Sequence, residues 1–148
     1  MDLLHKIDSR FIHAASTYYP TVARVSLFII YFYFGLLKLI GASPANELAV
    51  GFAERMGFGG VASELYLLLA AVECTIGLLL LFPKMTRLAL FIMFGHMLLV
   101  SAPLLLYPEA VWVMPFVPNL EGQYIIKNAA LVALALGLVA STQPLAKK

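Results

Sequence analysis

The sequence predicts an all-α integral membrane protein, a bundle of four membrane-spanning helices. Three observations lead to this fold class. Apolar residues make up 62% of the 148 residues and charged residues only 12%, against roughly 45–50% and about 25% in soluble domains. Four separate stretches are long and apolar enough to cross a bilayer. The basic residues are also unevenly divided between the connections, as in membrane proteins with a fixed orientation.

The same composition excludes several classes of protein. A soluble domain of this size could not bury so much apolar surface, so the sequence is not expected to be a soluble enzyme, a disordered chain or a disulfide scaffold. The net charge of +2 is small and the basic residues are scattered, so no nucleic-acid partner is expected. The single cysteine, Cys74, excludes an intrachain disulfide or CxxC centre. We expect residues 1–148 to form one membrane domain.

The segment 1–19 is predicted to be a short amphipathic helix on the cytoplasmic membrane surface. Apolar residues recur at helical spacing from Leu4 to Ala15, and Lys6 and Arg10 flank that stripe. The alternative is a frayed polar tail. We expect no cleaved signal peptide, because the first long apolar stretch lies far from the start and contains Lys38.

Membrane-spanning segments need about 20 mostly apolar residues. Backbone groups in lipid must pair within the chain, so the spans are expected to be helices. The turn at 83–86 is so short that its two neighbours must run antiparallel. The four predicted spans are residues 22–40, 64–82, 87–106 and 124–140.

The first of the two longer loops is predicted to be partly helical. Ser43 can cap a helix and Pro44 can occupy its first position. Apolar residues at spacing four continue the pattern over 45–56, and glycines from Gly57 onward end it.

Three prolines predict an irregular second long loop, at positions 108, 115 and 118. The apolar run 111–114 is expected to lie on the membrane or on the bundle as a lid.

The basic residues predict which side of the membrane each loop faces. On one side of the membrane, Arg55 is the only basic residue that lies outside the spans. Both termini should therefore be cytoplasmic, in a multi-pass protein of the inner (plasma) membrane. The seven basic residues on the opposite side are Lys6, Arg10, Arg24, Lys84, Arg87, Lys147 and Lys148.

A row of small residues marks one face of the fourth span, at Ala129, Ala133, Gly137 and Ser141. Such rows let another helix approach closely. We favour packing inside the monomer, since this helix must pack in the bundle. The alternative is a homodimer seam.

Ionisable residues inside spans are costly and usually face the bundle interior. They are Lys38, Glu73, His96 and Lys127. Glu73 and His96 lie at the middle of antiparallel spans, so they should share a depth. Helical side chains tilt toward the amino end of their helix, so Lys38 and Glu73 lean toward each other, whereas Lys127 leans toward the outer interface and can snorkel.

Two interpretations of this polar cluster stay open. The Lys38–Glu73 pair either ties two helices together or forms a site that binds a ligand or relays protons. His96 is either part of that site or simply hydrogen-bonded within the bundle. Tyr31 and Gly35 lie on the same face of the first span as Lys38. Neither a metal nor a haem is expected, because one histidine, one carboxylate and one thiol match no known ligand spacing.

Three short motifs give the sequence a resemblance to a known family. They are residues 35–38 (GLLK), Glu73 followed by residues 77–80 (GLLL), and residues 121–128 (EGQYIIKN). In order and spacing they resemble the DoxX-like membrane proteins, most closely the YkgB-type branch linked to oxidative and reactive-chlorine stress. The resemblance covers about 19–140.

The resemblance implies a four-helix inner-membrane protein. Some DoxX-like proteins are small subunits of a thiosulfate:quinone oxidoreductase, and others are membrane partners of redox proteins. Lys38, Glu73 and Lys127 match the polar positions of the family, and Glu121 and Asn128 lie in its last motif. These residues complete the set of candidate site positions.

Three functions are compatible with the sequence. A quinone-linked redox subunit, with Glu73 and His96 handling the proton, predicts a lateral opening toward lipid. A small-solute permease predicts a water-filled cavity that reaches one face. A non-catalytic scaffold or assembly partner predicts a dry bundle with exposed docking loops. The expected partners are the lipid bilayer and a redox protein or second copy.

Overall fold

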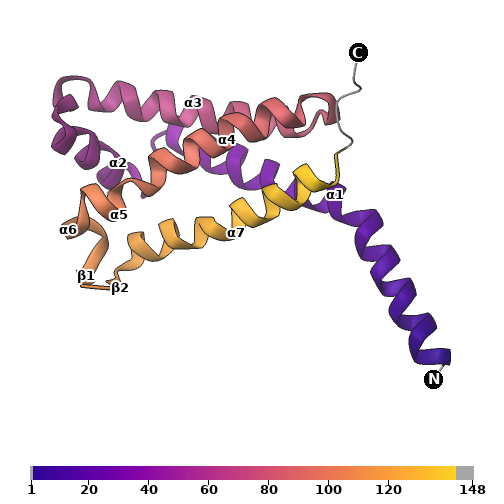
Figure 1. The fold of residues 1–148 in the computed structure, drawn as a ribbon. Coiled ribbons are helices and arrows are strands. Elements are labelled where there is room, and N and C mark those ends of the chain that lie inside the picture. The colour runs from indigo at the N-terminus through magenta and orange to yellow at the C-terminus, as the bar shows by residue number, and fades with distance from the viewer. Residues whose placement is uncertain (1, 143–148) are drawn as a thin grey trace, which may run out of the picture.

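The computed structural model describes residues 2–142 and places four long helices side by side (Figure 1). They are α1 (Asp2–Leu39), α3 (Ala62–Leu80), α4 (Thr86–Ser101) and α7 (Leu120–Ala140). All four stretches are long and apolar enough to cross a membrane. Two of them extend beyond a single helix: the stretch with α3 includes the helical turns before it, and the stretch with α4 includes the turns at both its ends. The predicted all-α four-helix bundle is thereby confirmed. The orientation stays a prediction, and two of its basic residues, Lys147 and Lys148, lie outside the described residues.

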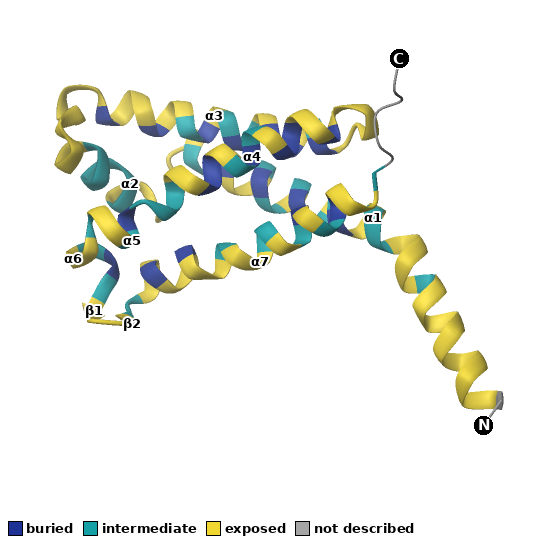
Figure 2. Ribbon diagram, viewed as in Figure 1, coloured by how far each residue is buried: buried dark blue, intermediate teal, exposed yellow. Residues whose placement is uncertain are grey.

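Helix α1 is longer than the sequence predicted. The segment 1–19 is not a separate helix, because α1 continues through Pro20 into the first span as 38 helical residues. Pro20 is the sole helix-breaking residue between the predicted helices 1–19 and 22–40. A single proline removes one backbone hydrogen bond, and this does not end the helix here. The amino-terminal part extends away from the bundle, and its apolar Leu4, Ile7 and Phe11 are exposed (Figures 1 and 2).

The first of the two longer loops is helical, as predicted, but its start differs. Helix α2 covers Asn46–Ala53 and is followed by a π turn, η1 (Glu54–Phe58), and a 3-10 turn, η2 (Gly59–Val61). The predicted cap at Ser43 is wrong, because its Oγ accepts a hydrogen bond from the backbone N–H of Ala45 before the helix begins. Gly57 has a φ of 89°, a left-handed conformation that ends the regular helix where predicted.

The second longer loop is more regular than predicted. After the 3-10 turn η3 (Pro83–Met85) and helix α4, it folds into α5 (Pro103–Leu106), α6 (Pro108–Val111) and an antiparallel pair, β1 (Trp112–Met114) and β2 (Val117–Pro118). The prediction of an irregular loop is therefore wrong. A proline opens each one-turn helix, where its fixed φ and missing N–H are tolerated.

This loop lies against the amino-terminal end of α7. Val111 is fully buried. Asn119 caps α7 by accepting from the backbone N–H of Gly122, and its amide donates to the carbonyl of Ala110. The start of the predicted lid therefore packs on the bundle, whereas Val113 and Met114 are exposed.

Helices α1 and α3 form the closest interface of the bundle. A Cβ on Gly35 would lie 2.8 Å from Cys74 Sγ, and one on Gly77 would lie 2.8 Å from Phe32 Cβ. The two glycines therefore let the helix backbones approach more closely than larger residues would allow. Figure 2 shows the buried residues gathered between α1, α3, α4 and the carboxyl-terminal half of α7. Among the largest of them are Leu27, Ile76, Leu80, Met93 and Leu138.

Helix α7 does not pack through its row of small residues. Ala129, Ala133 and Ser141 are exposed, so the favoured packing of the row inside the monomer is wrong for these positions. Gly137 alone meets a neighbour, the phenol of Tyr19 on α1. The helix instead turns a different face toward its neighbours. Its buried residues are Gly122, Ile125, Ala135 and Leu138.

Candidate functional site

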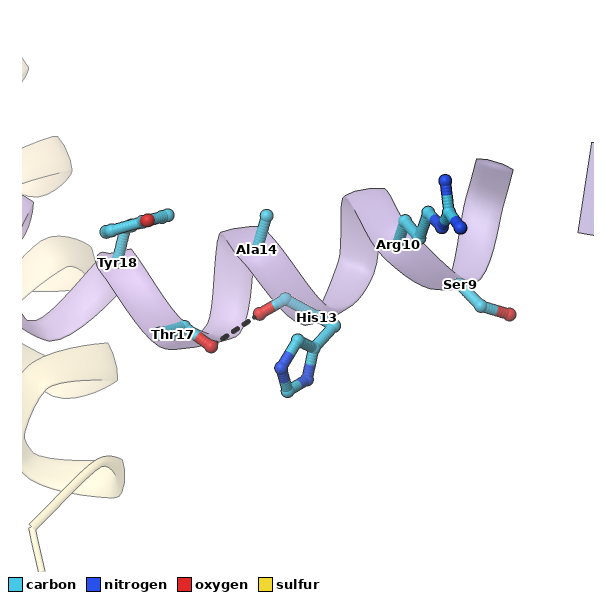
Figure 3. A pocket seen from close by; sticks show the side chains of 6 residues that line it. All are labelled: Ser9, Arg10, His13, Ala14, Thr17 and Tyr18. Carbon is cyan, nitrogen blue, oxygen red and sulfur yellow. Dashed lines mark hydrogen bonds between the residues drawn. The ribbon is translucent and has the colours of Figure 1, made fainter. Parts of the chain in front are cut away.

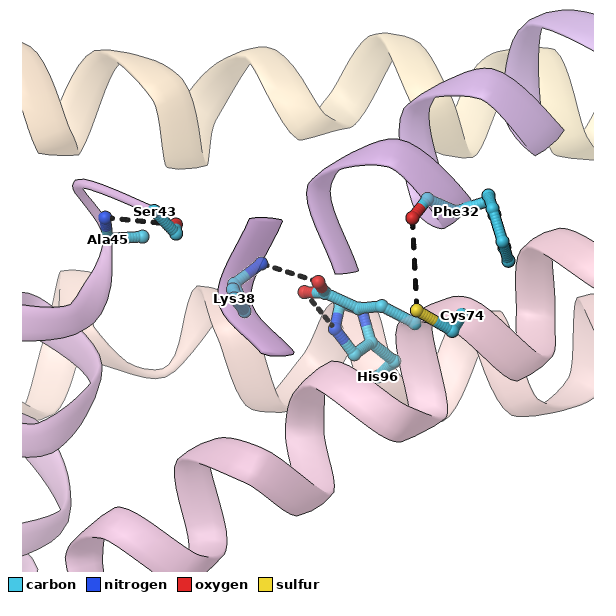
Figure 4. Close-up of polar contacts among 7 residues, drawn as sticks. Phe32, Lys38, Ser43, Ala45, Cys74 and His96 are labelled. Atoms are coloured by element: carbon cyan, nitrogen blue, oxygen red, sulfur yellow. Dashed lines mark hydrogen bonds and ion pairs between the residues drawn. The ribbon is translucent and has the colours of Figure 1, made fainter. Parts of the chain in front are cut away.

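Three helices bring Lys38, Glu73 and His96 together inside the bundle (Figure 4). Lys38 Nζ of α1 lies 2.5 Å from Glu73 Oε2 of α3. His96 Nε2 of α4 lies 3.1 Å from Glu73 Oε1. Both carboxylate oxygens of Glu73 therefore have a partner. We call these three residues the polar triad.

Helical periodicity explains how the triad assembles. Tyr66, Ala70, Glu73 and Gly77 recur on one face of α3 and are buried, so the carboxylate points toward the neighbouring helices. Small residues on that face admit α1, and Cys74 Sγ donates a long 3.8 Å hydrogen bond to the Phe32 carbonyl (Figure 4). The close approach of α1 to α3 brings Lys38 within reach of the carboxylate.

The side chains of the polar triad are almost fully buried. The side chains of Lys38, Glu73 and His96 are 11%, 8% and 5% exposed. A lone carboxylate at this depth would be very costly, whereas the ammonium group compensates its charge directly. With neutral His96 the triad carries no net charge, and one further proton on the imidazole makes it +1.

The Glu73 contact also assigns the tautomer of His96. A neutral imidazole that donates through Nε2–H to the carboxylate leaves Nδ1 as an acceptor. This Nδ1 is buried and has no hydrogen-bond partner among the described residues. The imidazole can therefore take up a proton at Nδ1 while Glu73 stabilises the resulting charge.

Two buried tyrosine hydroxyls accompany the triad. The ring of Tyr31 meets the ring of His96 edge to face, with centroids 5.5 Å apart. Within residues 2–142 neither the hydroxyl of Tyr31 nor that of Tyr66 has a hydrogen-bond partner. Buried polar groups are usually paired, and of these two hydroxyls that of Tyr31 belongs to the ring that lies against His96.

The other predicted site residues lie apart from the triad. Lys127 is exposed on α7, with Nζ 5.4 Å from the centre of the Tyr124 ring, and Glu121 is also exposed. Asn128 is half-buried on the side of α7 that faces α4. Gly35 belongs to the α1–α3 contact and serves packing.

A groove runs between the α4–α5 segment and α7. Its volume is about 410 Å³. Ser101 and Asn128 are its polar side chains, and neither makes a side-chain hydrogen bond with the described part of the chain. Met97, which follows His96 in α4, also lines it. The full lining is Met97, Ser101, Leu104, Ile125, Ile126, Asn128, Ala129 and Val132.

A second hollow carries no comparable site. Its lining residues, from Ser9 to Tyr18, all belong to α1, and Figure 3 shows their side chains spread along this one helix. Within the described residues no group of three or more His, Cys, Asp or Glu side chains could hold a metal ion.

The sequence interpretation missed the internal role of Arg24. Its guanidinium donates to Thr86 Oγ1 and, at 3.1 Å, to the Leu80 carbonyl, so it ties α1 to the turn between α3 and α4. Arg24 was counted only as a charge that sets orientation. Arg24, Tyr31 and Lys38 follow one another at intervals of seven residues, which places them on one face of α1. This spacing could have shown that Arg24 faces the bundle.

No protein-family model matches the chain, and no curated protein or solved structure shows significant similarity to it. The resemblance to DoxX-like proteins therefore rests on the short sequence motifs alone. The geometry of the polar triad is the firmer basis for a functional conclusion.

Proposed function

We propose that the chain is a quinone-linked membrane redox subunit, in which the polar triad exchanges protons with a quinone inside the bilayer. The observation that carries this proposal is the pair of buried, unpartnered atoms beside Glu73: the acceptor His96 Nδ1 and the donor Tyr31 Oη. A quinone oxygen needs a hydrogen-bond donor when oxidised and offers a hydroxyl proton when reduced, so these two atoms fit that group.

The residues of the chain would divide the work as follows. Tyr31 Oη donates a hydrogen bond that orients the oxygen. His96 holds a proton at Nδ1 for transfer, and Glu73 stabilises the imidazolium through Nε2–H. Lys38 keeps the carboxylate charged and in place. The quinone supplies the redox chemistry: it takes up two electrons from a reduced partner protein and two protons to become the quinol.

Two further features support this proposal over a permease. The motifs that resemble DoxX-like proteins include Lys38 and Glu73, and some of those proteins are described as quinone-linked. The triad itself forms a closed set of contacts across three helices and does not line a polar path.

Quinone content after purification tests the proposal. Wild-type chain purified in mild detergent should carry quinone that mass spectrometry detects, together with a redox partner. Tyr31→Phe and His96→Leu should each lower the quinone-to-protein ratio several-fold. Tyr33→Phe is the matched control, because that tyrosine is exposed, and it should leave the ratio unchanged. Equal ratios in all four proteins, or no quinone in any, would contradict the proposal.

The proposal includes an inner-membrane location with both termini in the cytoplasm. The division of the basic residues supports this orientation. Reporter fusions at the 83–86 turn and after position 148 should both report cytoplasm. A periplasmic signal from either fusion would reverse it.

A second candidate function is that of an assembly partner without catalysis. The exposed apolar side chains on the projecting part of α1 favour it, because they offer a docking surface away from the triad. In that case Phe11→Ser would release a co-purifying protein, His96→Leu would not, and no quinone would accompany the chain.

A further inference from the structure

The projecting part of α1, residues 3–18, is exposed on all sides, apart from the half-buried Ala14 (Figure 2). Within residues 2–142, its side chains make no hydrogen bond or ion pair with another element. The first side chain of α1 that bonds to another helix is Tyr19, whose hydroxyl donates a 2.7 Å hydrogen bond to the carbonyl of Leu134 on α7. Pro20 follows, and proline is a usual cause of a bend in a helix. The segment therefore leaves the bundle without a partner in it.

One side of α1 is apolar from the projecting part into the span. Exposed apolar side chains recur there every three or four residues, which is the spacing of one helix face. Leu3 borders this face and Ile12 lies off it. We call the face the apolar stripe. Its members are Leu4, Ile7, Phe11, Ala15, Tyr18, Val22, Val25 and Ile29.

The part of the stripe within the span faces away from the bundle. Leu27 is fully buried, whereas Val25 and Ile29 are 43% and 54% exposed. Residues two positions apart lie about 200° apart around a helix, so these two side chains point away from the core that holds Leu27. In a membrane-spanning helix that side lies against lipid. The stripe therefore continues a lipid-facing surface as far as Leu4.

The opposite side of the projecting part is polar. Arg10 and Thr17 extend the seven-residue spacing of Arg24, Tyr31 and Lys38, which face the bundle. When a helix leaves a bilayer and bends away from its bundle, its lipid-facing side turns toward the membrane surface and its bundle-facing side turns toward water. Figure 1 shows the projecting part slanting away from the other helices. The apolar stripe and the polar side thus suit this path.

We propose that residues 3–18 lie on the surface of the bilayer, with the apolar stripe in the boundary between headgroups and acyl chains. Amphipathic helices bind there through apolar area and, where they are basic, through attraction to anionic lipid. Residues 2–19 hold two bases, Lys6 and Arg10, and two acids, Asp2 and Asp8. Binding should therefore depend on the apolar stripe and not on anionic lipid. This inference is independent of the polar triad and of the quinone proposal.

The bilayer is favoured over a protein as the occupant of the stripe. The segment is joined directly to a membrane-spanning helix, so the bilayer is held beside it at high effective concentration. A second copy or another protein would have to bind from solution and displace that surface. The stripe also passes into the lipid-facing side of the span without a break, as a single lipid contact requires.

Spin labels on the full chain in phosphatidylcholine vesicles test the proposal. Each label is placed on one introduced cysteine in a Cys74→Ala background. Labels at Ile7→Cys and Phe11→Cys should collide with oxygen, which dissolves in lipid, whereas labels at Arg10→Cys and Thr17→Cys should collide with a water-soluble nickel chelate. The alternation should have the helical period and stay in phase with labels on the span. Added phosphatidylglycerol should leave it unchanged.

Two double variants separate apolar binding from electrostatic binding, with a label at Leu4→Cys as the reporter. Ile7→Ser with Phe11→Ser removes part of the apolar stripe and should move the reporter from oxygen to nickel. Lys6→Gln with Arg10→Gln is the matched control on the polar side. It should leave the reporter in contact with oxygen, because the bases are not what holds the segment on the lipid.

A label at Val25→Cys must keep its contact with oxygen in every variant, which verifies that the span is in place. The proposal is overturned if the labels of the stripe meet the nickel chelate as freely as those of the polar side. It is also overturned if the control variant releases the segment, since charge would then hold it. Spin–spin broadening on the stripe that disappears on dilution with unlabelled chain would assign the stripe to a second copy instead.

Discussion

Two carboxylate ion pairs among the described residues have nearly equal lengths but opposite surroundings. Lys38 and Glu73 are 2.5 Å apart and almost fully buried. Arg55 and Glu109 are 2.6 Å apart, with side chains 47% and 53% exposed. The inner pair, Lys38–Glu73, joins α1 to α3 within the bundle, whereas the outer pair, Arg55–Glu109, joins the two longer loops, from η1 to α6. Distance alone therefore does not distinguish a costly contact from an ordinary one.

The difference shows in what each pair requires from its neighbours. Arg55 also donates to the carbonyl of Leu106 and lies over the ring of Tyr107, so its side chain has alternatives if Glu109 is lost. Lys38 has no such alternative among the described residues, and Glu73 needs His96 for its second oxygen. Burial thus makes the contacts of the inner pair interdependent, because an unpaired polar group in such surroundings is costly.

The largest expected effect comes from breaking the inner pair. Glu73→Gln leaves the ammonium of Lys38 uncompensated inside the bundle, which typically costs about 3–5 kcal/mol in the free energy of unfolding. Denaturation in mild detergent should show this loss. Glu109→Gln is the matched control at the outer pair. An equal effect of the two substitutions would mean that burial does not separate the pairs.

The next effect concerns the helix contact that holds the inner pair in place. Gly35→Ala puts a methyl group 2.8 Å from Cys74 Sγ and 2.9 Å from its backbone nitrogen, and such overpacking costs about 1–3 kcal/mol. Gly95→Ala is the control, because a Cβ there meets nothing within 4 Å. It should be neutral or stabilise α4 by up to about 1 kcal/mol. Thermal unfolding of both variants would measure the contrast.

A smaller effect of opposite sign is expected at Tyr31. Its buried hydroxyl lacks a partner among residues 2–142, so Tyr31→Phe removes an unpaired polar group and should stabilise the chain by about 1 kcal/mol. Denaturant titration of ligand-free protein would detect the gain. A clear loss of stability would show that the hydroxyl is hydrogen-bonded in the native protein.

The smallest effect belongs to the outer pair. Arg55→Gln should cost less than about 1 kcal/mol, as exposed ion pairs do, and high salt should reduce that cost further. Unfolding at low and high salt would test this. A loss comparable to that of Glu73→Gln, independent of salt, would contradict the contrast between the two pairs.

The fold was largely predictable from sequence because lipid enforces a simple pattern. Long apolar stretches can cross a bilayer only as helices or closed barrels, and each predicted span falls, to within two residues, on a helical stretch long and apolar enough to cross a membrane. The continuity of α1 through Pro20 was not predictable, since proline usually marks a boundary. The hairpin after Val111 was also missed, because it is too short to show an alternating pattern.

The contacts among Lys38, Glu73 and His96 were predictable from depth and tilt, since both follow from helical geometry. What depth cannot supply is the rotation of a helix about its axis. The small row of α7 was expected to pack inside the monomer, yet the structure turns Ala129, Ala133 and Ser141 outward. The two buried tyrosine hydroxyls without partners could be recognised only in the structure, because sequence does not reveal which buried atoms stay unpaired.

The most direct test of the central claim, that the polar triad is a proton site and not only a structural tie, is the double variant Lys38→Met with Glu73→Gln. Its stability in detergent and its bound quinone should be measured together. Removing both charges should recover most of the stability lost by either single change, because no uncompensated charge remains. The quinone-to-protein ratio should stay as low as in Glu73→Gln. Recovery of stability and quinone together would show that the pair only ties the helices, and contradict the account.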